Sequence, residues 1–314
     1  MDSMPFMPGA LVAQPLRSLL VDAGRHPRGQ PHFSAASGLV CAHGRAYVIS
    51  DEEHHLAVFS DLHSPGTLHR ILPGDLPHSK KARKRLKPDL EALLLLPAFN
   101  GSAHSALVAF GSGSRPNRDL GVVIPLNARG EPSTRVQRFD LKPLYEPLRE
   151  ALGEINIEGA MLLGDELVLL NRAVTGRSKN AAAHYRASAL RAVIEGRRRR
   201  VAPRSIRTYR LGSIDGTELG FTDGVALPGG GWVFCAAAEN TADSYADGPC
   251  RGAALGVVDA RGEVAAVHRL APPPHAALKV EGIAARRHEA GIDICLVTDA
   301  DDPLQSSQLL LARL

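Results

Sequence analysis

The feature of this sequence that most constrains its fold is a short motif that occurs five times. An acidic or hydroxyl residue is followed by a small residue and then an apolar one, in the copies Ser37-Gly38-Leu39, Glu91-Ala92-Leu93, Glu158-Gly159-Ala160, Asp223-Gly224-Val225 and Glu281-Gly282-Ile283. Successive copies lie about 54 to 67 residues apart. Self-similarity at such a spacing is typical of repeat architectures. We therefore expect one structural unit to be repeated five times.

Each copy opens a group of short apolar segments separated by turn residues. After the first copy, segments at 37–42, 45–50, 56–59 and 68–72 are divided by Gly44 and by a polar tip that begins at Asp51. Short apolar runs bounded by such residues are typical of a β-meander. The sequence predicts four-stranded units at about 37–73, 90–140, 157–212, 222–271 and 280–314.

The last unit is one strand short, and a lone strand-like segment at 15–22 precedes the first unit. Propellers close their ring by completing one blade from both chain ends, which hides the sheet edges. The sequence thus predicts an all-β, five-bladed β-propeller of four-stranded blades. It forms a single domain over residues 1–314, in which the N-terminal strand completes the last blade. A six-bladed propeller with an extra meander at 141–154 or 185–200 is the alternative.

Two segments of the chain have some helical character. Residues 143–152 are expected to form a short helical turn. Residues 185–194 are expected to form a strand, with an amphipathic helix over 182–195 as the alternative, since alanine, leucine and arginine favour helices.

Composition limits the cellular context that we expect. No apolar run reaches the ~18 residues needed to span a bilayer, and the N-terminus lacks the pattern of a secretion signal. We expect a soluble, cytoplasmic protein that binds neither membrane nor nucleic acid. The four cysteines, Cys41, Cys235, Cys250 and Cys295, show no C-x-x-C spacing and are interpreted as inert buried thiols.

The repeated motif also predicts a metal site. The first strand of each propeller blade lines the central channel, so the opening residues should form one ring, which consists of Ser37, Glu91, Glu158, Asp223 and Glu281. Carboxylates gathered in a channel repel one another unless their pKa values rise or a cation neutralises them. Calcium suits such a ring of oxygen ligands, although another divalent cation could serve. The alternative is that each acid merely marks a turn and faces solvent.

Charged loop residues gather at what should be the channel entrance. One half is expected to be basic, with Lys80, Lys81, Arg83, Lys84, Arg85, Lys87, Arg115, Arg118, Arg172, Arg177 and Lys179, and the other acidic, with Asp51, Glu52, Glu53, Glu239, Asp243, Asp299, Asp301 and Asp302. Arginine and lysine bind phosphate and carboxylate oxygens. We therefore interpret Lys87, Arg115, Arg118 and Arg177 as candidate ligands of an anionic small molecule. Loop tips are commonly charged without a ligand, which is the alternative.

Several stretches resemble the calcium-activated nucleotidases (apyrases). The likeness rests on the five motifs together with Tyr47-Val48-Ile49-Ser50-Asp51 and Leu169-Leu170-Asn171-Arg172. It implies a five-bladed propeller whose central calcium is held by the residues that open the inner strands. It also implies Asp51 and Arg172 as catalytic residues. The aspartate-rich first strand and the Lys-Glu-Trp segment of that family have no counterpart here, and phytase-like esterase propellers are a looser likeness.

Two functions are consistent with these patterns. The first is a calcium-dependent hydrolase of a phosphorylated or otherwise anionic small molecule. The second is a non-catalytic propeller in which a structural ion pins the blades while the loops bind a ligand or a protein.

Overall fold

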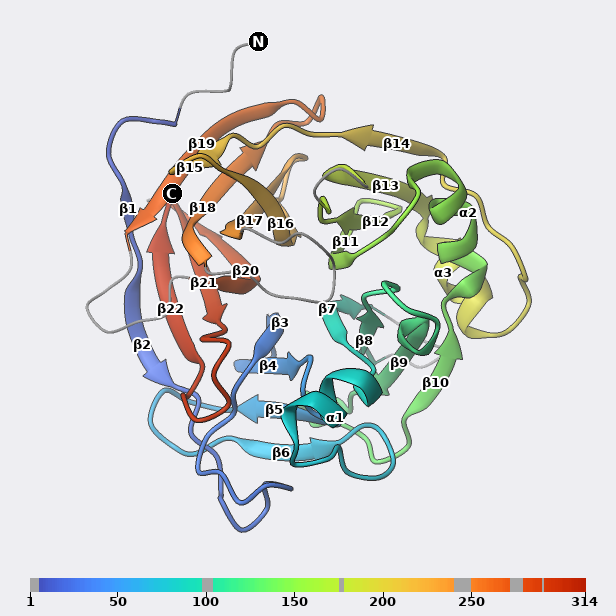
Figure 1. The fold of residues 1–314 in the computed structure, drawn as a ribbon, viewed down its shortest axis with the longest axis vertical. Coiled ribbons are helices and arrows are strands. Elements are labelled where there is room, and N and C mark those ends of the chain that lie inside the picture. Colours follow the sequence, from blue (N-terminus) through green and yellow to red (C-terminus); the bar gives the residue numbers. More distant parts are fainter. Residues whose placement is uncertain (1–5, 98–103, 175–177, 240–249, 272–278, 290) are drawn as a thin grey trace.

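The computed structural model of the protein describes residues 6–97, 104–174, 178–239, 250–271, 279–289 and 291–314. Five sheets stand around a central axis, each with one strand at the centre and its later strands further out (Figure 1). The innermost strands are β3 (Ala36–Ala42), β7 (Leu90–Leu96), β11 (Ile157–Leu163), β16 (Thr217–Ala226) and β20 (Val280–His288). The predicted all-β, five-bladed propeller is confirmed.

Antiparallel pairing in chain order completes each sheet. Blade one adds β4 (Arg45–Ser50), β5 (His55–Phe59) and β6 (Thr67–Arg70), and blade two adds β8 (Ala106–Gly111), β9 (Leu120–Pro125) and β10 (Gln137–Asp140). Blade three adds β12 (Glu166–Asn171), β13 (Ala181–Arg186) and β14 (Ser205–Thr208). Blade four adds β17 (Trp232–Glu239), β18 (Cys250–Val258) and β19 (Val264–Ala271), with the short β15 (Ser213–Ile214) on the other side of β16.

Blade five contains strands from both ends of the chain. Its C-terminal strands β21 (Gly291–Thr298) and β22 (Gln308–Arg313) are followed by the N-terminal β2 (Gln14–Ser18), which pairs antiparallel with β22. The predicted closure is confirmed, with a strand shorter than the expected 15–22. A further strand, β1 (Leu11–Val12), pairs parallel with β19 of blade four and was not predicted. The N-terminal segment therefore adds strands to blades four and five.

Helices occur only between strands in the described residues. They are α1 (Lys80–Leu86), the 3-10 turn η1 (Pro116–Arg118), α2 (Lys142–Leu152) and α3 (Ala187–Ile194). The turn predicted at 143–152 is confirmed as α2. The strand predicted over 185–194 is wrong beyond Arg186, where β13 ends and α3 begins. Helical spacing brings Leu190, Val193 and Ile194 to one buried face, which favours the helix there.

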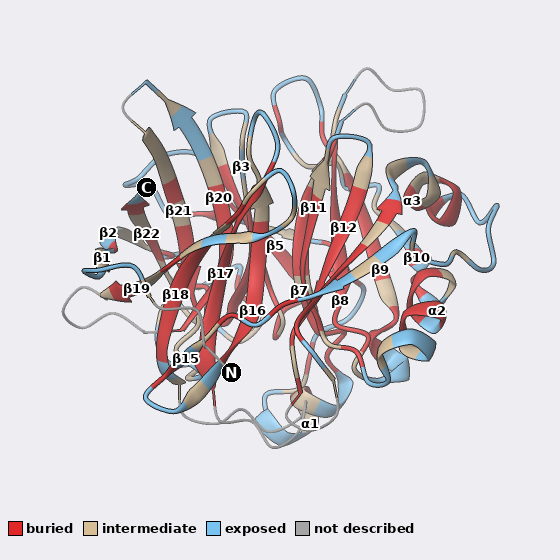
Figure 2. Cartoon of the chain, turned by 90° about the horizontal axis from the view of Figure 1, so that it is seen from above, coloured by how far each residue is buried: buried red, intermediate tan, exposed pale blue. Residues whose placement is uncertain are grey.

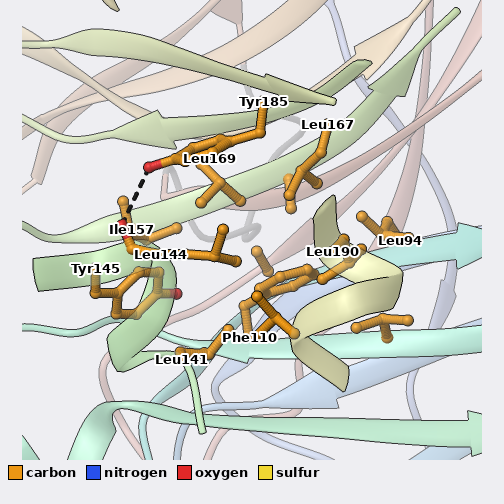
Figure 3. Packing of buried hydrophobic residues seen from close by; sticks show 14 of the residues in the cluster. Leu94, Phe110, Leu141, Leu144, Tyr145, Ile157, Leu167, Leu169, Tyr185 and Leu190 are labelled. Atoms are coloured by element: carbon orange, nitrogen blue, oxygen red, sulfur yellow. Dashed lines mark hydrogen bonds between the residues drawn. The ribbon is translucent and has the colours of Figure 1, made fainter. Parts of the chain in front are cut away.

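Apolar side chains from neighbouring blades interdigitate and hold the inner strands in place. Figure 2 shows buried residues along the strands and exposed residues at the ends of the sheets, with α1 at one end of the molecule. Between blades two and three, Phe110 and Leu169 pack with Tyr145 of α2, and the Tyr185 hydroxyl donates to the Leu144 carbonyl at 3.2 Å (Figure 3). No helix in the described part of the chain has the length and apolarity to cross a membrane.

Candidate functional site

Every inner strand contains a β-bulge at the same point relative to its neighbour. One residue is skipped in the pairing of each inner strand with the second strand of its blade, and the skipped residues are Ser37, Glu91, Glu158, Thr222 and Glu281. A bulge leaves the extra residue outside the ladder and turns its side chain to a new direction. These five residues, here called the bulge ring, occupy equivalent positions around the channel.

The bulge ring corrects one position of the predicted ring. In blade four the pairs are Phe221 with Ala236 and Asp223 with Cys235, so Thr222 is the bulged residue and Asp223 lies one position further on. The Asp223-Gly224 dipeptide resembles the Glu-Gly dipeptides of the other blades. The sequence comparison of the blades therefore placed Asp223 in the ring position that Thr222 occupies.

Asp223 is buried and its carboxylate accepts hydrogen bonds from backbone amides of its own blade and of the two neighbouring blades. It accepts hydrogen bonds from the amides of Gly224 at 2.7 Å and Ile283 at 3.1 Å, and from that of Ala160. Burial raises the pKa of Asp223 well above its usual range, although these amides oppose the shift. Its carboxylate therefore links blades three, four and five, and its role as a metal ligand stays a prediction.

The two hydroxyls of the bulge ring make the same contact in different blades. Ser37 Oγ donates to the Leu90 carbonyl and Thr222 Oγ1 to the Val280 carbonyl, both at 2.6 Å. Each acceptor directly precedes the bulge-ring glutamate of the next blade. The hydroxyls thus fix the backbone from which Glu91 and Glu281 project.

Four residues of the bulge ring line a polar cavity at the channel mouth, namely Ser37, Glu91, Glu158 and Glu281. Two further sets of residues complete its wall. The first set lies two residues before a bulge-ring residue in the sequence and consists of Asp89, Asn156 and Lys279. The second set directly follows the second strand of a blade and consists of Asp51, Arg172 and Asp299. Asp89 and Lys279 were not predicted as site residues, although their fixed distance from the motif could have revealed them.

A first group of charges surrounds Lys87. Its Nζ forms ion pairs with Asp51 and, at 2.8 Å, with Asp89, which also pairs with Arg118 at 2.6 Å. Oxygens of Asp51, Asp89 and Glu91 lie within 4.8 Å of one another. Burial raises the pKa of Asp51 to about 6 despite Lys87. Burial acts in the same direction on Asp89, but Lys87 and Arg118 outweigh it and keep its pKa below the usual value.

A second group surrounds Lys279. Its Nζ lies 3.1 Å from both Glu239 and Glu281 and 3.0 Å from Asp301. The other carboxylate oxygen of Glu281, Oε2, is buried and has no hydrogen-bond partner among the residues that the structure describes. Glu281 itself is only 4% exposed and lines the cavity. Burial raises the pKa of Glu281 to about 7, although Lys279 opposes the shift.

Arg172 connects blade three to blade four. Its guanidinium pairs with Glu239 at 2.6 Å and lies 3.8 Å from Glu158. A Cβ atom on Gly220 would lie 2.8 Å from Cγ and 2.9 Å from Nε of Arg172. Only glycine at position 220 therefore leaves room for the Arg172 side chain. Burial raises the pKa of Glu158 to about 8, with Arg172 opposing and Glu281 adding to the shift.

The predicted division of the mouth into basic and acidic halves is wrong. Lys87, Arg118 and Arg172 are buried in ion pairs with acids from other loops, so positive and negative side chains are mixed around the cavity. Of the other predicted anion ligands, Arg115 precedes η1 and is absent from the cavity wall, and Arg177 lies outside the described residues.

The donor set fits a hard divalent cation. The acids lining the cavity, Asp51, Asp89, Glu91, Glu158, Glu281, Asp299 and Asp301, outnumber its cations, Lys84, Lys87, Arg118, Arg172 and Lys279. The unpartnered Oε2 of Glu281 faces this excess of negative charge. Calcium binds such carboxylate and carbonyl oxygens in adaptable geometries. The residues present could therefore hold a calcium ion beside Lys87 and Lys279.

Comparison with known proteins gives a family and distant structural likenesses. The sequence profile of DUF6929, a family of unknown function, matches residues 32–314. No curated protein matches. Solved structures include a putative glycoside hydrolase from Parabacteroides distasonis, with 12% identity, TM-score 0.49 and coverage of 99% of this chain and 97% of that one. A glutaminyl cyclase from Myxococcus xanthus has 13% identity, TM-score 0.48 and coverage of 98% and 100%.

A third structure is regucalcin, a calcium-binding protein from Agrobacterium tumefaciens. It has 13% identity, TM-score 0.46 and coverage of 97% of both chains. Likenesses this distant carry no argument about the site.

Proposed function

This chain belongs to the DUF6929 family of unknown function, and we propose that its channel binds a divalent cation with which it hydrolyses a small anionic molecule. The ligands are the carboxylates of Glu91, Glu158 and Glu281, and calcium is the cation that we propose. The observation that carries the proposal is the buried Oε2 of Glu281, which lacks a hydrogen-bond partner among the described residues and belongs to a cavity that Glu91 and Glu158 also line. A buried acceptor without a partner is costly, and a bound cation would satisfy it.

The bound ion would polarise a phosphoryl oxygen and make a nearby water more acidic. Asp51 is the residue that we assign as proton acceptor, because its Oδ1 is buried at the mouth and no group in the described part of the chain donates a hydrogen bond to it. In the proposed step, the water oxygen bonds to phosphorus, its proton passes to Asp51 and the bond from phosphorus to the leaving oxygen breaks. Arg172 holds Glu158 and Glu239 in position and acts as a positioning residue.

The anion would be bound by α1, which contributes two lysines to the cavity mouth. Lys80 and Lys84 line the outer part of the mouth together with Asp51. Lys80 is exposed, and it donates to the Asp301 carbonyl at 3.1 Å. A phosphate bound by Lys80 and Lys84 would lie on the same side of the cavity as Asp51, the proposed base.

Metal binding is tested by calorimetric titration of chelator-treated protein with calcium. We expect one ion per chain in the wild type and at least tenfold weaker binding in Glu281→Gln. Glu218→Gln is the matched control, because Glu218 is exposed at the start of the inner strand β16. Equal binding by both variants would remove Glu281 from the site, and no binding by the wild type would remove the metal.

Catalysis is tested separately with a panel of phosphoesters and phosphoanhydrides. We expect turnover of at least one member with calcium, its loss with chelator, and a rate at least tenfold lower in Asp51→Asn with calcium binding retained. Calcium binding without turnover of any member would reject the hydrolase and leave the metal site intact.

One observation favours the non-catalytic alternative. Lys87, Arg118 and Arg172 are held in buried ion pairs, an arrangement that joins blades and does not recognise a ligand. In that case calcium would raise the melting temperature while every substrate of the panel remained intact.

A further inference from the structure

Two cysteines far apart in the sequence meet at the interface of blades five and one. Cys41 lies on β3 and Cys295 on β21. Alternate residues of a strand share a face, so Cys41 faces the same side as Leu39, and Cys295 the same side as Val297. Leu39 and Val297 belong to one apolar cluster, which fills the space between these blades, and Cys295 packs against it. The two thiols therefore face each other.

The strands that carry this pair, β3 and β21, pack against each other. The Cys41 thiol donates a hydrogen bond to the Cys295 sulfur, which lowers the pKa of Cys295. Cys41 is exposed to solvent and Cys295 is half-buried, so a small oxidant can reach the pair. The expectation of four inert buried thiols is thus wrong for Cys41.

The other two cysteines have different surroundings. Cys235 is buried with its sulfur 3.2 Å from Thr222 Oγ1, and burial raises the pKa of its thiol well above the usual value. Burial likewise raises the pKa of Cys250, to about 11. Low thiolate content makes both poor nucleophiles at neutral pH.

We propose that Cys41 and Cys295 form a reversible disulfide that locks blade one to blade five. The Cys295 sulfur attacks a peroxide oxygen to give a sulfenic acid and one water, and the Cys41 sulfur then displaces the second water as the S–S bond forms. Two thiols are oxidised and one peroxide is reduced to two waters. A dithiol reductant reverses the reaction.

The bond would close the propeller covalently where its chain ends meet. Blade five is completed by β2 from the N-terminus, and the next blade begins with β3. Hydrogen bonds of β2 with β22 otherwise provide this closure. A disulfide that encloses most of the chain restricts the unfolded state strongly, and we expect the melting temperature to rise by roughly 5 °C or more.

The test exposes the purified full-length protein to hydrogen peroxide and maps its disulfides by peptide mass spectrometry. We expect two free thiols to disappear, a Cys41–Cys295 peptide to appear, the melting temperature to rise and dithiothreitol to reverse all three. Cys41→Ser should abolish these changes, and Cys250→Ser should retain them.

Cys41→Ser is the decisive variant because Cys41 is exposed and serine should be tolerated there. A different cysteine pair, an unchanged thermal shift in Cys41→Ser, or two free thiols that survive in the oxidised wild type would overturn the proposal.

Discussion

Blades four and five share one backbone design at the channel but present opposite chemistry. Blade five places Lys279, Glu281 and Asp299 at three wall positions, all of them charged. The strand register gives Gly220, Thr222 and Ala237 as the equivalents in blade four. Both inner strands nevertheless contain the same bulge. The bulge therefore forms whether or not the skipped residue is charged. The charge of the cavity wall depends on the side chains that each blade places at these positions.

The neutral wall of blade four has its own consequence. Arg172 of blade three passes over Gly220 to reach Glu239 at the end of β17. A charged side chain at position 220 would block this path. Blade four thus contributes space, whereas blade five contributes ligands.

The largest expected effect follows from removing the side chain that uses this space. Arg172→Met leaves the buried Glu239 and Glu158 without their guanidinium partner, and breaking a buried ion pair from one side costs about 3 to 5 kcal/mol. Urea unfolding measures the loss of free energy.

The control for this variant is Arg207→Met, whose ion pair with Glu263 lies at the surface. We expect that substitution to cost less than about 1 kcal/mol. Equal losses in the two variants would show that the Arg172 pair contributes no more than a surface pair.

An effect of intermediate size is the change of the free energy of unfolding with pH, which depends on the buried glutamates of the charged blades. The folded-state pKa values of Glu158, about 8, and Glu281, about 7, lie above the ordinary glutamate value of 4.5. Between pH 4.5 and 8 the folded chain binds more protons than the unfolded one, so stability falls as the pH rises. We expect a loss on the order of 2 kcal/mol in chelator, measured by urea unfolding at pH 5 and pH 8.5.

Glu281→Gln should make this fall shallower, because the glutamine does not titrate. Glu218→Gln in blade four should leave it unchanged, since Glu218 is exposed. Calcium should also reduce the fall by binding the ionised form. Stability that rises with pH through this window would contradict the raised pKa values.

The smallest expected effect compares the two hydroxyls of the bulge ring. Thr222→Val and Ser37→Ala each remove one hydrogen bond to a neighbouring blade, worth about 1 kcal/mol. Thermal unfolding should show similar losses for both variants. A much larger loss for Ser37→Ala would show that blades one and four use the bulge differently.

The sequence was sufficient to predict the repeat, the number of blades and the closure by the N-terminal strand. These features depend on periodic apolar runs and on the number of strands, and both can be recognised from short stretches of sequence. The register of Thr222 was not predictable in this way, because the Asp223-Gly224 dipeptide matches the motif better than the true bulge does.

Features that depend on the packing of distant segments were also missed. Lys279 and Asp89 each lie two positions before a motif glutamate, but that spacing shows their place in the cavity only once the inner strands are known to stand side by side. The ion pair of Lys87 with Asp51 was not predicted either, because it joins two loops that lie far apart in the sequence. The contact between Cys41 and Cys295 likewise depends on which two blades meet when the ring closes.

The most direct test of the central proposal is anomalous diffraction from crystals grown with manganese as a probe for the divalent site. The proposal predicts one strong anomalous peak in the channel cavity, within bonding distance of the Glu281 carboxylate, and its absence in Glu281→Gln crystals. A cavity without a peak in the wild type, or a peak that persists unchanged in the variant, would contradict it.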